Sequence, residues 1–130
     1  ILSLRNIVSG CECNVMTLTI MPSSCKFAAS GGTTKFAIYN ITDGRLAFKV
    51  KTTNVVNYRV QPVYGFVEKR SKADLIILRL PGPPKEDKFY IQWADVQPEE
   101  TEPEAPFKAG AQIGEVILTI STNESLMGVK

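Results

Sequence analysis

The sequence predicts an all-β fold, a β-sandwich of seven short strands, and three observations support this prediction. Apolar and polar residues alternate with a period of two in several short stretches, which is typical of strands with one buried and one wet face. Turn-forming residues separate these stretches. No stretch has a helical period longer than one turn. A chain of 130 residues is long enough for one domain with a substantial core.

The strands follow one another with turn signals between them. They are residues 17–21 resumed at 25–28, then 34–40, 46–52, 58–62, 73–80, 88–94 and 114–121. In the first strand, Pro22 interrupts the alternation, because proline cannot donate to a sheet ladder. After the second strand, Asp43-Gly44 is expected to form a tight hairpin turn, since this dipeptide readily adopts positive φ angles.

The third and fourth strands flank a polar Lys-Thr-Thr corner. The third strand places Lys49 and Lys51 between apolar neighbours, so the two lysines are expected on one exposed face. The fourth strand is expected to end at Pro62 and Gly65, because proline breaks a ladder and glycine allows turn geometry.

The last three strands differ in pattern. The fifth is continuously apolar, which is consistent with burial on both faces. The sixth alternates, with Phe89, Ile91 and Trp93 on one face and Lys88, Tyr90 and Gln92 on the other. Residues 95–110, between the sixth and seventh strands, are acidic and contain three prolines. They are expected to lack regular structure.

Composition argues against several classes of function. The net charge of +2 is too small to indicate nucleic acid or a membrane surface as partner. No apolar run is long enough for a membrane span. The chain has no histidine, which removes the commonest general base, and no phosphate-binding loop. Cys11, Cys13 and Cys25 fit neither a disulfide framework nor a four-ligand zinc site. We therefore expect a non-enzymatic protein of the reducing cytosol, without cofactor or metal.

One exposed face is a candidate binding site. In an immunoglobulin-like sandwich, the third strand lies beside the sixth. Lys49 and Lys51 would then share a sheet face with Lys88, Tyr90 and Gln92. Three lysines around a tyrosine suit an acidic, aromatic peptide, because the charges steer it and the ring adds apolar contact. The alternative is that the lysines only keep the face soluble.

Four stretches carry a resemblance to a known family. They are LTIMPSSCKF, FKVKTTNVVNYRVQP followed by VYGFV, KEDKFYIQWA and EVILTI. Together they resemble the MSP (major sperm protein) domain over residues 16–120. The resemblance implies an immunoglobulin-like, seven-stranded β-sandwich of the MSP/PapD-like type. It places the domain at residues 16–121, with an extension at 1–15 and a tail at 122–130.

One branch of this family, the VAP adaptors of membrane contact sites, binds acidic FFAT-type peptides. The positions that match its peptide-binding motif are Lys51, Thr52, Thr53, Lys88 and Tyr90. Tyr90 departs from the methionine of the adaptors, and Glu115 lies near where they place a second basic residue. VAPs also have a C-terminal membrane helix, which this sequence lacks, so it is interpreted as a soluble relative or a fragment.

The other branch consists of nematode sperm cytoskeletal proteins. VYGFVEKRSKADLIILRLPGPPKEDK looks closest to its small sperm-specific members. After Trp93 the chain departs from the main filament-forming protein. The resemblance therefore implies a cytoplasmic, filament-associated protein of the sperm pseudopod, with MSP-family proteins or filaments as partners. A homodimer is one form that it allows.

Overall fold

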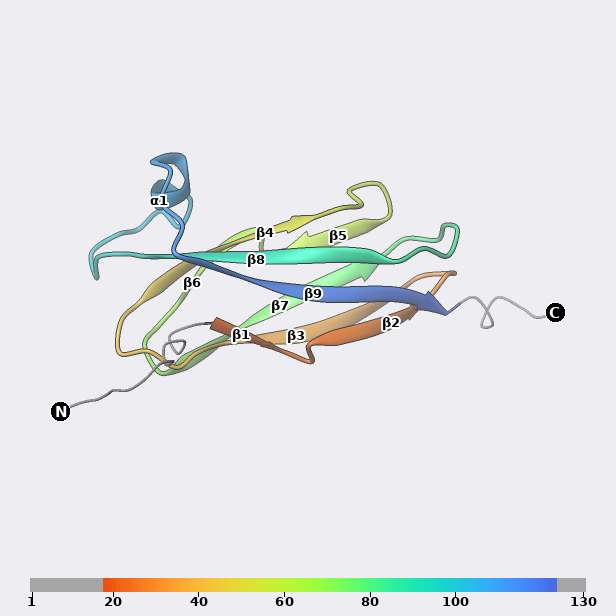
Figure 1. Cartoon of the computed structure of the whole chain (residues 1–130), viewed down its shortest axis with the longest axis horizontal. Helices are drawn as coiled ribbons and strands as arrows, with labels where there is room; N and C mark the ends of the chain where they lie inside the picture. The colour runs from red at the N-terminus through yellow and green to blue at the C-terminus, as the bar shows by residue number, and fades with distance from the viewer. Residues whose placement is uncertain (1–17, 124–130) are drawn as a thin grey trace, which may run out of the picture.

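The structure, a computed structural model, describes residues 18–123, and its strands form two stacked sheets (Figure 1). The strands are β1 (Leu18–Met21), β2 (Ser24–Ala28), β3 (Gly32–Asn40), β4 (Leu46–Thr52), β5 (Tyr58–Gln61), β6 (Tyr64–Val67), β7 (Ser71–Arg79), β8 (Asp87–Asp95) and β9 (Gly114–Asn123). One sheet has the order β1-β3-β7-β5 and the other has the order β2-β9-β8-β4-β6. Paired strands run antiparallel, except for the parallel pair β2 and β9. The predicted all-β sandwich is confirmed.

The chain passes from one sheet to the other at two prolines. The predicted first strand is divided into β1 and β2 at the cis bond Met21–Pro22, and the predicted fourth strand corresponds to β5, which is followed by β6 after the cis bond Gln61–Pro62. At each of these prolines, the strand before it pairs in the four-stranded sheet and the strand after it in the five-stranded sheet. Proline supports these crossings because it offers no N–H to continue a ladder. Eight of the nine observed segments therefore correspond to the seven predicted strands, whereas β6 lies beyond the predicted end of the fourth strand.

Gly65 does not end a strand, contrary to the prediction. It lies within β6, opposite Phe48 of β4. A Cβ atom at Gly65 would lie 2.7 Å from Cζ of Phe48. Glycine at this position lets the buried Phe48 ring pack directly on the backbone of the neighbouring strand.

The link between β3 and β4 is not the predicted hairpin turn. The two strands belong to different sheets, so residues 41–45 cross between the sheets, and Gly44 has no positive φ. The buried side chain of Asn40 fastens this link to the end of β6. Arg70 Nε also donates to Asp43 Oδ1 at 2.8 Å. This hydrogen bond, reinforced by the guanidinium charge, lowers the pKa of Asp43.

The core lies between the two sheets and is formed by alternate side chains of both. β7 contributes Leu75 and Ile77, which are fully buried, whereas Ile76 and Leu78 are 41% and 37% exposed. The prediction that this strand is buried on both faces is therefore wrong. The outer face of the four-stranded sheet is open to solvent, and apolar side chains stand on it.

The loop between β8 and β9 contains some regular structure. Residues Ala105–Lys108 form a single helical turn, α1, with a proline in its first positions. The fixed φ of proline suits the start of a helix, so the prediction of a loop without regular structure is wrong at this turn. Among the residues that the structure describes, no helix has the length and apolar character needed to cross a bilayer.

Candidate functional site

The structure brings the predicted lysines together on the outer face of the five-stranded sheet. β4 pairs with β8, with Lys51 opposite Tyr90 and Lys49 opposite Gln92. Lys88 follows on the same face of β8. We call Lys49, Lys51, Lys88 and Tyr90 the lysine face. The predicted neighbourhood of the third and sixth strands is confirmed.

The lysines of this face differ in their surroundings. Lys51 and Lys88 are exposed. Lys49 is half-buried, with its ammonium group 5.7 Å from the ring centroid of Tyr64, in the range of a cation–π contact. Within residues 18–123, none of the three lies within 4 Å of a carboxylate. Their positive charge is therefore available to attract an anionic partner.

The Lys-Thr-Thr corner is held by hydrogen bonds inside the protein. The Thr52 hydroxyl accepts from the Asn54 amide at 3.1 Å. The Thr53 hydroxyl donates to Asp87 Oδ1 at 3.0 Å and accepts from the Lys88 amide at 3.1 Å. These two predicted site residues thus shape the corner that presents the lysines. A role in direct partner contact stays a prediction for both.

Asp87 joins the corner to the start of β8, and sequence reasoning did not identify it. Its side chain is 1% exposed and accepts from Thr53 Oγ1 and from Asn54 Nδ2, the latter at 3.1 Å. Lys85 Nζ lies 3.7 Å from Asp87 Oδ1. A signal was present in the sequence, because Asp87 occupies an inward position in the alternation of the sixth strand.

Replacing Asp87 with alanine is expected to destabilise the fold by about 3 kcal/mol, because the buried Asn54 amide and the Thr53 hydroxyl would lose a charged acceptor. Urea unfolding followed by circular dichroism measures this change. Asp95→Ala is a matched control, since Asp95 is the exposed last residue of the same strand. If the two variants unfolded at the same urea concentration, Asp87 would not hold the corner.

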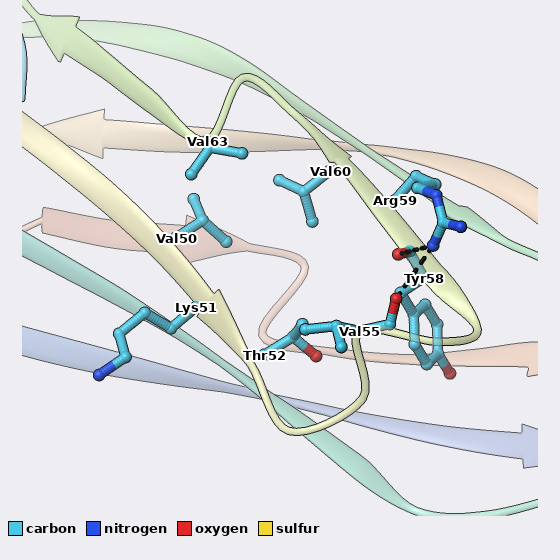
Figure 2. A pocket seen from close by; sticks show the side chains of 8 residues that line it. All are labelled: Val50, Lys51, Thr52, Val55, Tyr58, Arg59, Val60 and Val63. Carbon is cyan, nitrogen blue, oxygen red and sulfur yellow. Dashed lines mark hydrogen bonds between the residues drawn. The ribbon is translucent and has the colours of Figure 1, made fainter.

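A groove of about 550 Å³ adjoins the lysine face where the chain crosses from β4 to β5. It is lined by Val50, Lys51, Thr52, Val55, Tyr58, Arg59, Val60 and Val63. Figure 2 shows Val50, Val60 and Val63 pointing toward one another, while Lys51 points away from them. Val55 is 71% exposed at its rim. The site thus combines a cationic face with an apolar groove, which sequence reasoning missed although adjacent valines in a polar stretch indicated it.

Residues 96–113, which we call the acidic loop, are attached at the other end of the same sheet. Arg45 Nη1 donates to the carbonyls of Gln97, Pro98 and Glu100, the last at 2.8 Å. Its guanidinium also stacks on Phe66, 3.7 Å from the ring centroid. The Phe107 ring of α1 lies 6.0 Å from that of Tyr64. Among residues 18–123, no carboxylate of the acidic loop forms an ion pair with a lysine of the lysine face.

The described residues contain no group of His, Cys, Asp and Glu side chains arranged for a metal ion. The side chains around the lysine face and the groove are lysines, valines, threonines, tyrosines and one arginine, Arg59. This arrangement can hold an extended segment of another protein through charge attraction and apolar contact.

Comparison with known proteins gives consistent matches. A family model described as the MSP (Major sperm protein) domain matches residues 17–116. Sperm-specific class P protein 32 of Caenorhabditis elegans is 52% identical over 106 residues, which cover 82% of this chain and 99% of that protein. The solved structure of WR4, a C. elegans MSP family member, is 52% identical, with a TM-score of 0.80 over 82% of this chain and 97% of that one.

A more distant match concerns the fold alone. The ASH / PapD-like domain of human CEP192 has a TM-score of 0.59 at 11% identity, covering 95% of this chain and 96% of that domain. The predicted immunoglobulin-like, PapD-like sandwich is thus confirmed.

Proposed function

The chain belongs to the MSP (Major sperm protein) domain family, and from this membership we propose that it is a cytoskeletal protein of nematode sperm. In this proposal it is a structural component or a regulator of MSP filaments in amoeboid motility, and it acts through protein–protein contacts in the sperm cytoplasm and pseudopod. The family is a structural, non-enzymatic one, and we propose no catalysis and no cofactor.

One observation carries the proposal. The sperm-specific C. elegans relatives match this chain at about half of their residues and along nearly their full length. Identity of this extent, with a TM-score of 0.80 to the structure of WR4, supports the same fold in these proteins. The tissue named for these relatives supports a role in sperm, and the membership of WR4 in the MSP family supports a role beside MSP proteins.

We propose the lysine face, with Thr52 and Thr53 of its corner, as the surface that meets these partners. Uncompensated lysines raise the rate at which an acidic surface is encountered, and the half-buried Tyr90 adds apolar contact. The adjoining valine groove adds area that a partner can bury.

Binding of FFAT-type peptides, as in the VAP adaptors, is the alternative function for the same face, and it has less support than contact with MSP-family partners. The β9 residues beside the lysine face are Glu115, Ile117 and Thr119, none of which is basic. Glu115 also accepts a hydrogen bond from Gln92 at 2.9 Å. The tyrosine at position 90 likewise replaces the methionine of the adaptors.

Sedimentation with preformed MSP filaments tests the proposed function. The wild-type chain is expected in the pellet at micromolar concentration. The variant Lys51→Glu/Lys88→Glu is expected to bind at least about tenfold more weakly, because the reversed charges repel an acidic partner. Lys35→Glu/Lys72→Glu, on the outer face of the other sheet, is the matched control and should bind like the wild type. A wild-type chain that stays in the supernatant would contradict the proposal.

A further inference from the structure

The acidic loop presents negative charge at one end of the five-stranded sheet. It carries Glu99, Glu100, Glu102 and Glu104 against a single lysine, Lys108. Glu99 and Glu102 are exposed. Figure 1 shows α1 and this loop projecting from the end of the sandwich where β8 ends and β9 begins. A partner can therefore approach these carboxylates from outside the sandwich.

This loop is held in a defined shape. Backbone carbonyls of the loop accept hydrogen bonds from Arg45, as described above. In addition, the Glu100 carboxylate accepts from the backbone amides of Thr101 and Glu102, at 3.2 and 3.1 Å. The packing of Phe107 on Tyr64 fixes its helical turn to β6. A preorganised loop loses little conformational entropy when it binds, which favours association.

The two exposed lysines of the lysine face lie toward the opposite end of the sheet. Lys88 is next to the first residue of β8 and Lys51 lies opposite Tyr90, whereas the acidic loop follows the last residue of β8. Asp95 is seven residues after Lys88, a distance of about 23 Å at 3.3 Å per residue. Arg45 anchors the loop at its own end, and among residues 18–123 none of its carboxylates forms an ion pair with Lys51 or Lys88.

Exposed apolar side chains accompany each charged end. Val55 and Val56, in the turn after the corner, are 71% and 72% exposed. Ile113, the last residue of the acidic loop, is 59% exposed. Both ends thus combine charge of one sign with apolar surface, as an interface with a small apolar centre and a charged rim would require.

We propose that the lysine face of one copy binds the acidic loop of a second copy. The two surfaces are different, and the exposed lysines Lys51 and Lys88 lie toward the end of the sheet opposite the acidic loop. The contact is therefore head-to-tail, and each bound pair keeps one free loop and one free lysine face. Contacts of this kind build open chains unless the rotation between copies closes a ring. This inference rests on the proposed function in one respect, since it names a second copy as a partner of the same face.

The contact is expected to be weak and sensitive to salt, because it joins exposed charges. Sedimentation velocity should show a weight-average mass that rises with protein concentration at about 50 mM salt and falls toward the monomer at about 500 mM. A chain that remains monomeric at several hundred micromolar in the lower salt would overturn the inference.

Charge reversal on each surface identifies the contact. Lys51→Glu/Lys88→Glu and Glu99→Lys/Glu102→Lys, each alone, are expected to associate at least about tenfold more weakly, since like charges then meet. All four positions are exposed, and unchanged thermal melting would show that both variants fold. Association that is unaffected in either variant would mean that another surface is used.

Mixing the two variants gives the sharpest test. In a one-to-one mixture, the reversed lysine face meets the reversed loop and the native loop meets the native lysine face, so association is expected to return. The variant with all four changes should also associate with itself. If neither recovered, the inference would be wrong, as it would if the wild-type lysine face bound only an added acidic peptide.

The filament experiment separates this inference from the proposed function. A chain that co-sediments with MSP filaments but stays monomeric by itself would overturn the head-to-tail contact alone. A chain that self-associates as described but does not co-sediment would overturn the proposed function alone.

Discussion

Replacing Asn40 with alanine is expected to lower the free energy of unfolding by about 3 kcal/mol, because backbone groups of Thr42, Gly44 and the buried Val67 would lose their hydrogen-bond partner. Asn40 Nδ2 lies 2.8 Å from the carbonyl oxygen of Gly44 and 3.0 Å from that of Val67. Its Oδ1 accepts from the amide and the hydroxyl of Thr42, at 2.9 and 2.7 Å. The side chain is 1% exposed, so water does not replace these bonds.

The expected loss corresponds to a fall in Tm of about 10–20 °C for a domain of this size. Thermal and urea unfolding measure it. Thr33→Ala is the matched control, since Thr33 is an exposed residue of the same strand, and it should change stability by less than about 0.5 kcal/mol. Asn40→Asp keeps the shape of the side chain but removes both donors, so it should be destabilised as well. A fully stable Asn40→Asp variant would contradict this explanation.

Gly114→Ala is expected to destabilise the fold by about 3 kcal/mol, because the added methyl group would overpack the core. A Cβ atom at Gly114 would lie 2.2 Å from Cζ2 and 2.5 Å from Cε2 of Trp93, its partner across β8 and β9. Trp93 is 5% exposed. The ring must leave its packed position to make room for the methyl group, and a close-packed interior resists such a shift.

Tryptophan fluorescence follows this change directly, since Trp93 is the only tryptophan of the chain. Gly114→Ala should shift the native emission spectrum and lower the urea midpoint. Gly44→Ala is the control, because a Cβ atom at Gly44 has nothing within 4 Å and the residue has no positive φ. Equal midpoints for the two alanine variants would show that the Trp93 ring does not require glycine beside it.

The exposed faces of β4 and β8 could be predicted from the sequence. The alternation around Lys49 and Lys51 placed both on the exposed side of β4, and that around Tyr90 did the same for β8. Their adjacency then followed from the strand order of an immunoglobulin-like sandwich, and the register of β4 with β8 bears it out. These predictions succeeded because the period of two is a property of the extended backbone itself.

Other features of the site could not be predicted in this way. Asp43-Gly44 is typical of a hairpin, yet β3 and β4 enter different sheets, because Asn40 ties the link to the end of β6. Gly65 is typical of a turn, yet it lies inside a strand, because Phe48 packs on it. In both cases a partner distant in sequence determined the outcome.

By itself, the sequence determined the all-β class, the positions of all strands but β6, and the side of β4 and β8 that carries the lysines, since these depend on local periodicity. Only the tertiary structure decided that the chain changes sheets at Pro22 and Pro62, that Asp87 and Asn40 hold the links, and that the acidic loop follows the end of β8 that lies away from Lys51 and Lys88. The physical reason is that strand pairing and buried hydrogen bonds join residues far apart in the chain, and their energy depends on the space that the two packed sheets leave between them.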